Sequence, residues 1–127
     1  MKFREYKTSK ENLVLLGKND ETNEELIKQI SSDEFVLHTS KPGSPFANIK
    51  FPSEKLSKEE IYEAGIFCAK HSQGWRDNKK DVKVHIFLGK DIYKTKSMKT
   101  GTFGIKDFKE IIIKKEDILE FEKAKPK

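Results

Sequence analysis

Residues 57–70 read SKEEIYEAGIFCAK, and this stretch is the clearest helix signal in the chain. Ser57, with Glu60 three residues later, has the spacing of a capping box that begins a helix. Small and apolar residues recur at helical spacing on one face, at Ile61, Ala64, Gly65, Cys68 and Ala69. Because small side chains allow close approach, we expect this helix to lie across a β-sheet with Cys68 buried. Gly74 is the expected C-terminal stop.

Strand patterns flank this helix on both sides. After it, residues 82–88 alternate between apolar and other side chains, which is the period of a half-buried strand. Before it, the same kind of pattern appears on either side of a Pro-Gly turn, which predicts an antiparallel pair. The full set of expected strands is 3–7, 12–16, 35–39, 46–51, 82–88 and 108–113.

A second and shorter helix is expected after Gly17. Thr22 is its predicted N-cap, with Glu25 at the capping-box position, and the apolar stripe is Leu26, Ile27 and Ile30. At 127 residues the chain has room for one domain with one core. We therefore predict an α+β fold: a single domain with a curved, mostly antiparallel sheet of about six strands, one long helix and one short helix. Residues 1–115 form the expected domain and 116–127 a frayed, charged C-terminal tail.

Charge is unevenly distributed along the chain. The net charge is +5, with 35% apolar and 37% charged residues. Residues 1–64 hold ten Lys/Arg and twelve Asp/Glu (net −2), and residues 65–127 hold sixteen and nine (net +7). A concentrated positive field attracts polyanions, so this basic protein is expected to bind nucleic acid. The alternative explanation is a bias toward lysine as a solubilising residue, since only Arg4 and Arg76 are arginines.

Several protein classes are disfavoured. No stretch approaches the roughly 18–20 apolar residues of a membrane span, and the amino terminus is charged from Lys2 onward, so we expect a cytoplasmic protein without membrane contact. The single cysteine excludes an internal disulfide and a thiol-based metal cage. His38, His71 and His85 lack metal-ligand spacing. A Cys68–His71 nucleophilic pair lacks an orienting carboxylate, so we expect no enzyme, no metal and no cofactor.

The segment 38–45 is the first candidate for ligand contact. It is a polar turn between two apolar strands. Gly43 permits close backbone approach to a ligand, and Lys41 with the hydroxyl of Ser44 can contact phosphate oxygens. The alternative is a plain Pro-Gly turn without a binding role.

The segment 71–80 is the second candidate. Trp75 is followed by Arg76 and by two lysines, Lys79 and Lys80. An indole ring can stack on an unpaired base while the cations hold its phosphate. The alternative interpretation places Trp75 at the end of the hydrophobic core.

The order of these motifs resembles the NFACT-R domain. The residues that carry the resemblance are Gly17-Lys18-Asn19 with Asn23, residues 35–38, Pro42-Gly43-Ser44, Ala69 with His71-Ser72, Trp75-Arg76, residues 82–87, Lys94-x-Lys96, and Gly101-Thr102-Phe103. The resemblance covers about residues 3–115, and its strength lies in the ordered set rather than in any single motif. NFACT-R is the RNA-binding module of ribosome-associated NFACT proteins, which add C-terminal tails to stalled nascent chains.

The chain also departs from the family pattern. Pro45 stands where many relatives have histidine after Pro-Gly-Ser, and Val36 stands where many have tryptophan. Full NFACT proteins carry an amino-terminal domain, a helix-hairpin-helix segment and a coiled coil, none of which this sequence contains. We therefore expect a stand-alone NFACT-R protein, to which tail synthesis does not carry over.

The resemblance implies RNA binding, to tRNA or ribosomal RNA, with a link to translation or ribosome quality control and to the ribosome as a partner. Phosphate contacts are expected from Lys41, Arg76, Lys79, Lys80, Lys94 and Lys96. A polar patch for sugar, phosphate or a base edge is expected from Lys18, Asn19, Asn23, His38, Gly43 and Ser44. Two alternatives stay open: a DNA-binding module, because a membrane-associated relative is linked to DNA, and a protein-interaction module with a basic surface. The oligomeric state is left unassigned.

Overall fold

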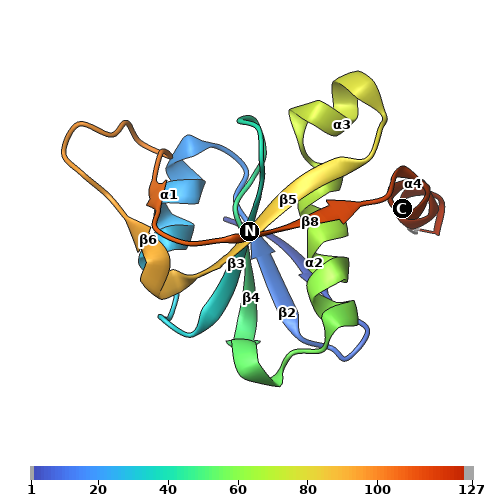
Figure 1. Ribbon diagram of the computed structural model, residues 1–127, viewed down its shortest axis with the longest axis horizontal. Coiled ribbons are helices and arrows are strands. Elements are labelled where there is room, and N and C mark those ends of the chain that lie inside the picture. Colours follow the sequence, from blue (N-terminus) through green and yellow to red (C-terminus); the bar gives the residue numbers. More distant parts are fainter. Residues whose placement is uncertain (1, 125–127) are drawn as a thin grey trace.

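A central antiparallel sheet organises the chain (Figure 1). The computed structural model describes residues 2–124. Its six strands run in the order β1-β2-β4-β3-β5-β8, and β6 and β7 form a separate two-stranded ribbon. The predicted α+β class is confirmed. The elements are β1 (Arg4–Lys7), β2 (Leu13–Leu16), α1 (Asp20–Lys28), β3 (Glu34–Thr39), β4 (Ala47–Pro52), η1 (Ser53–Lys55), α2 (Lys58–Lys70), α3 (Gln73–Asn78), β5 (Val82–Leu88), η2 (Gly89–Asp91), β6 (Ile92–Tyr93), β7 (Gly104–Ile105), β8 (Lys109–Ile113) and α4 (Lys115–Ala124).

Helix α2 covers one face of the sheet, as its sequence predicts. It begins with the expected capping box, in which the Ser57 hydroxyl accepts from the Glu60 amide at 3.2 Å and the Glu60 carboxylate accepts from the Ser57 amide at 3.2 Å. A Cβ on Gly65 would lie 2.5 Å from Cδ1 of Ile113, so glycine is required for this approach to β8. Cys68 is fully buried, and burial raises the pKa of its thiol to about 12. The thiol is therefore packed and unreactive.

Helix α1 covers the opposite face, so the sheet has two apolar clusters rather than the single core predicted. Leu26 is fully buried here beside Val36 and Phe46. The predicted N-cap is wrong. Asn19 caps the helix, its side chain accepting from the Thr22 amide at 2.9 Å, while Thr22 occupies the third helical position and its hydroxyl accepts from the Asn19 amide at 2.9 Å.

The long helix ends earlier than predicted. Helix α2 stops at Lys70, and a separate short helix, α3, follows with Ser72 as its N-cap. Gly74 lies inside α3 and is not the stop. The Ser72 hydroxyl accepts from the Trp75 amide at 3.2 Å, which starts a new turn where the first helix would otherwise fray.

Helix α4 replaces most of the predicted charged tail. Ile118 is fully buried and Phe121 packs against Phe67 at a ring-centroid distance of 5.3 Å. Apolar residues at this three-residue spacing form one face of a helix, and that face docks on α2 although the rest of the segment is charged. Residues 125–127 of the predicted tail lie outside the described residues.

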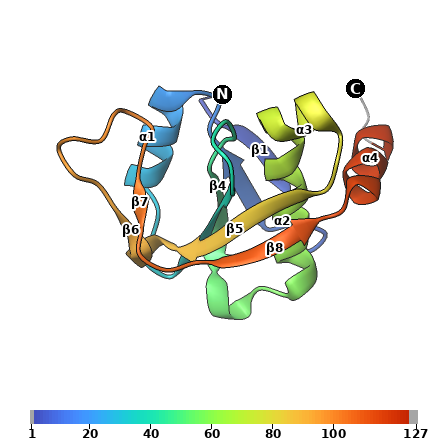
Figure 2. The same ribbon diagram turned by 45° about the horizontal axis from the view of Figure 1, so that its top comes forward.

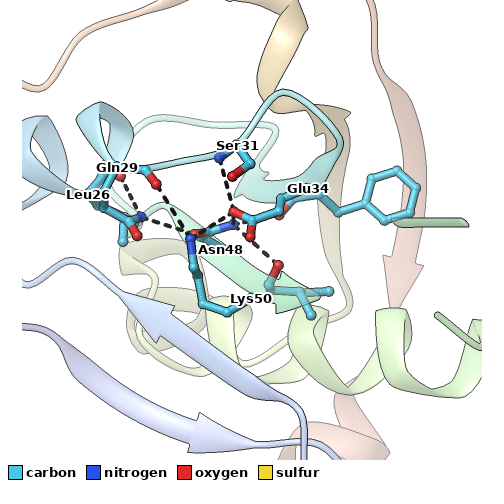
Figure 3. A network of polar contacts seen from close by, with 8 residues as sticks. Leu26, Gln29, Ser31, Glu34, Asn48 and Lys50 are labelled. Carbon is cyan, nitrogen blue, oxygen red and sulfur yellow. Dashed lines mark hydrogen bonds and ion pairs between the residues drawn. The ribbon is translucent and has the colours of Figure 1, made fainter. Parts of the chain in front are cut away.

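A buried polar network joins the end of α1 to the sheet (Figure 3). Asn48 on β4 is fully buried and accepts from the Gln29 side-chain amide at 3.0 Å. The same Gln29 group donates to the Leu26 carbonyl at 2.8 Å. Asn48 donates to the Glu34 carboxylate at 3.3 Å, and Lys50 pairs with that carboxylate at 2.8 Å. Because its polar groups are paired, Asn48 is tolerated in the apolar face between strand and helix.

A buried carboxylate ties the β1–β2 hairpin to the start of α2. Glu60 is 1% exposed and accepts hydrogen bonds from Thr8, Asn12 and Ser57. Burial acts to raise the pKa of this carboxyl, but the hydrogen bonds outweigh burial and hold the pKa below its usual 4.5.

We predict that Glu60→Gln lowers the free energy of unfolding by about 2 kcal/mol at neutral pH, because buried donors lose an ionised acceptor. The unfolded chain binds more protons than the folded chain as pH falls below 4.5, so the wild type loses this stability in acid. Urea unfolding should therefore show the gap between the two proteins closing below that pH. Glu59→Gln, on the exposed side of the same turn, should change stability by less than about 0.5 kcal/mol. A difference in unfolding free energy that stays constant at all pH values would contradict an ionised, hydrogen-bonded Glu60.

Candidate nucleic-acid interface

A cleft of about 640 Å³ lies at the end of the sheet where the β3–β4 turn is found. The turn stands between α1 and α3, as both ribbon views show (Figures 1 and 2). The walls come from the β2–α1 connection, the β3–β4 turn, the start of α3 and residues 101–105. Segments from both halves of the sequence therefore meet around one opening.

Much of the predicted site comes together in this cleft. Eight of the predicted residues line it, drawn from both the polar group and the basic group: Lys18, Asn19, Asn23, His38, Lys41, Gly43, Ser44 and Arg76. The predicted phosphate contacts and the predicted polar patch thus share one face of the molecule. The sequence alone did not decide this question. No helix in the described part of the chain has the length and apolarity of a membrane span, and residues 2–124 contain no cluster of three or more His, Cys, Asp or Glu suited to a metal ion.

Several of these polar residues hold the walls of the cleft. Asn23 is 7% exposed, and its side-chain oxygen accepts from the Phe46 amide at 3.2 Å. The Ser44 hydroxyl accepts from the Thr39 amide at 3.1 Å. Asn19 is committed to capping α1. Amide and hydroxyl side chains that pair with backbone groups in this way hold the surrounding backbone in place.

Gly43 has a role that the sequence did not indicate. Its φ is 97°, and a Cβ would lie 2.8 Å from the side chain of Gln73. Its carbonyl accepts from the Gln73 amide at 2.8 Å. The glycine is therefore needed for contact between the β3–β4 turn and α3, and its close approach to a ligand stays a prediction.

His38 is held as a neutral ring at the floor of the cleft. Burial lowers its pKa, although a hydrogen bond to the Thr39 carbonyl acts in the other direction. Nδ1 donates to that carbonyl at 2.8 Å in the neutral tautomer, which leaves Nε2 as an acceptor. The ring packs on Phe46 with centroids 4.4 Å apart. His38 can thus accept a hydrogen bond from a ligand but does not add positive charge near neutral pH.

Four cations line the cleft. Arg4 donates to the Gly17 carbonyl at 3.3 Å, which holds its guanidinium at the rim. Arg76 keeps 68% of its side chain exposed and pairs with the adjacent Asp77 at 3.2 Å. Lys18 and Lys41 complete the set. Asp20 is the one acidic residue in the described lining, so the balance is positive.

Trp75 does not lie in the cleft, and its predicted stacking role is wrong. The ring is 1% exposed and its Nε1 donates to the Glu122 carboxylate at 3.1 Å. It closes the core at the end of α2, which was the alternative interpretation. The Lys79 ammonium lies 4.8 Å from the centroid of this ring. Lys79 and Lys80 are not among the lining residues, and their predicted contribution is outside the cleft.

The 94–103 loop is attached to α1 by contacts that place its last residues in the cleft wall. Lys94 pairs with Glu24 on α1 at 3.1 Å and donates to the Thr102 carbonyl at 2.8 Å. The Gly101 amide donates to the same Glu24 carboxylate at 2.7 Å. Lys94 therefore holds residues 101–103 in the cleft wall and is not itself among the lining residues. Lys96 lies on the exposed part of this loop, outside the lining.

Sequence reasoning missed several lining residues, of which Arg4 and His85 matter most. Arg4 pairs with Leu16 across the β1–β2 hairpin, which brings it to Gly17 and the start of the cleft. The expected strands 3–7 and 12–16 come close to this signal, because antiparallel pairing of two successive strands brings the start of the first to the end of the second. His85 is the cross-strand partner of His38, and only the order of strands in the sheet reveals that proximity.

Comparisons with known proteins identify a matching family and a similar fold. The profile of a family described as NFACT protein RNA binding domain matches residues 2–107. The C-terminal part of the fibronectin/fibrinogen-binding protein from Streptococcus suis has a similar structure, with a TM-score of 0.82 and 21% sequence identity. The similarity covers 94% of this chain and 48% of that chain, and at this identity it shows the fold alone. No curated protein sequence matches the chain.

Gly43→Ala should lower the free energy of unfolding by about 1–3 kcal/mol, because alanine is strained at positive φ and collides with Gln73. Gly74→Ala is the matched control: a Cβ there meets nothing closer than 4.0 Å, inside helix α3. That variant should be unchanged or gain up to about 1 kcal/mol. Thermal or urea unfolding of both variants checks the difference. Equal stability of the two would show that the turn tolerates a side chain.

His38 should titrate below 6.5 in a pH series of imidazole NMR signals, because its buried ring resists protonation. The neutral form is the stable one, so stability that depends on His38 falls as pH drops below 6.5. His38→Gln should remove this part of the pH dependence of the unfolding midpoint. A midpoint at or above 6.5 would contradict the buried, neutral ring.

Proposed function

The chain belongs to the NFACT RNA-binding domain family, and we propose that it binds tRNA or ribosomal RNA in the cleft at the end of the sheet. The observation that carries the proposal is the convergence of Arg4, Lys18, Lys41 and Arg76 on one hollow from four separate segments. A concave, positively charged surface lined by hydrogen-bonding groups fits a folded nucleic-acid backbone better than a flat basic patch does.

The proposed mechanism is backbone recognition. The four cations neutralise phosphates and release their counterions, which supplies affinity that falls as salt rises. Their backbones are held by capped helix starts and by the Gly43–Gln73 contact, so the site is formed before the ligand arrives. This arrangement predicts little sequence preference from the cations themselves.

RNA is favoured over DNA by the neutral polar groups of the cleft. The Nε2 acceptor of His38 and the hydroxyl-bearing side chains of Ser40 and Thr102 suit a ribose 2′-hydroxyl, which acts as donor and acceptor. A ligand of this kind supports a place in translation or ribosome quality control, in the cytoplasm, with the ribosome as partner. DNA binding is the alternative ligand.

A binding role is favoured over catalysis. The matching family is one of RNA-binding domains rather than of enzymes. The one nucleophile considered, Cys68, is fully buried with a pKa of about 12, so it is neither ionised nor accessible to a substrate. The neighbouring His71 instead pairs with the Tyr6 hydroxyl at 2.8 Å.

We predict that a Lys41→Gln/Arg76→Gln double variant binds labelled tRNA more weakly and with a flatter salt dependence. Each lost phosphate contact removes about 0.7–0.9 from the slope of log affinity against log salt. Fluorescence anisotropy over a salt series measures both effects. The control, Lys55→Gln/Lys58→Gln, removes the same charge at the other end of α2 and should leave the slope close to that of the wild type.

Single-stranded RNA and duplex DNA complete the comparison. Binding to tRNA that persists at salt concentrations where duplex DNA dissociates supports an RNA site beyond general charge. Equal and rapidly vanishing binding to all three nucleic acids would overturn the proposal and indicate a protein-interaction module with a basic surface. An equal loss of RNA affinity in the cleft variant and in its control would place the bound RNA outside the cleft.

A further inference from the structure

A row of aromatic rings leads out of the cleft across the sheet. His38 packs on Phe46 with ring centroids 4.4 Å apart. His38 on β3 is the cross-strand partner of His85 on β5. The His85 ring in turn packs on Phe108 with centroids 4.1 Å apart and an interplanar angle of 30°. The rings therefore run from Phe46, just before β4, to Phe108, just before β8, on the face that carries α1.

The outer end of this row is not covered within the described chain. Phe108 and Ile112 are each 48% exposed, although both are large apolar side chains. Leu15, Val36 and Phe87 on the same face are buried in the α1 cluster, so the helix protects only the inner part of the face. Lys83 is exposed and is the cross-strand partner of Ile112. We call Lys83, His85, Phe108 and Ile112 the β5–β8 platform.

Neighbouring contacts hold the platform in place. The His85 ring nitrogen pairs with the Glu110 carboxylate at 3.2 Å, and Glu110 is its partner across the β5–β8 ladder. Phe108 is thus backed by a ring that is itself fixed between strands. A rigid exposed aromatic ring loses little conformational entropy when a flat group stacks on it.

We propose that the β5–β8 platform stacks an unpaired RNA base while the adjacent cleft holds the strand's phosphates; this rests on the proposed function. Continuity is the first argument, because His85 belongs both to the cleft lining and to the platform. Charge gives a second reason: the backbone carbonyl of exposed Lys83 accepts from the Ser40 amide of the β3–β4 turn, so this cation lies between the cleft and Ile112 on the edge strand. A ligand that fits must carry negative charge at regular intervals and flat aromatic faces between them, which describes single-stranded RNA. Phe108 would then supply the stacking that Trp75 cannot.

The test compares Phe108→Ala with Phe108→Trp and with Leu119→Ala. Leu119 is a matched control, since it is an exposed apolar residue, at 39%, on α4 rather than on the platform. The probes are a short oligouridylate carrying one 2-aminopurine, whose fluorescence falls on stacking, and an RNA duplex of equal length. Sedimentation of the free proteins accompanies the binding measurements.

We expect Phe108→Ala to weaken binding of the single strand by about tenfold, to restore 2-aminopurine fluorescence and to leave the duplex unaffected, because paired bases are not available for stacking. Phe108→Trp should bind like the wild type, and so should Leu119→Ala. Unchanged affinity and quenching in Phe108→Ala, with a wild type that binds RNA, would overturn the platform and leave the proposed function intact. A shift of free Phe108→Ala from dimer to monomer without loss of RNA affinity would assign the face to a second copy and also overturn it. A wild type that binds neither probe would overturn the proposed function and the platform together.

Discussion

The centre of the sheet is buried on both faces, and the rest of the structure depends on this constraint. Val36 and Leu37 are consecutive on β3, point to opposite faces, and are both fully buried. Apolar surface on both sides must be covered, so α1 and α2 take opposite faces. The connection that leads into α1 and the connection that leads out of α2 then lie at the same end of the sheet, around the β3–β4 turn. The cleft is formed by this convergence.

The cleft is preorganised by neutral contacts rather than by its charges. Asn19 caps α1, Asn23 holds the Phe46 amide, and Gly43 seats the turn on α3. The Glu24 carboxylate fastens residues 101–103 to α1 through an amide and an ammonium group. The cations are attached to segments that these contacts already order. Repulsion among like charges is therefore opposed by short-range hydrogen bonds that salt screens only weakly.

Local patterns predicted the elements, and long-range packing decided the site. Alternation located β5 and the capping box located α2 because both signals lie within one segment. The α1 cap was misplaced because Asn19 with Thr22, and Thr22 with Glu25, share the same spacing. Trp75 is buried partly because Glu122 of α4 accepts a hydrogen bond from its ring. The sequence did not predict α4, because its few apolar residues are interspersed with charged ones. The net charge of each half of the chain was also a poor guide to the position of the site. Three of the four cleft cations, Arg4, Lys18 and Lys41, come from the half with net negative charge.

Segments from both halves of the chain form the proposed RNA-binding cleft. Titration of the ¹⁵N-labelled protein with tRNA, followed by amide NMR shifts at low and at raised salt, tests it most directly. We expect shifts to concentrate at residues 17–18, 40–44, 73–76 and 101–103, and this set to persist as salt rises while scattered lysine shifts fade. Shifts concentrated on α2 and α4, or distributed over lysines without regard to the cleft, would contradict it.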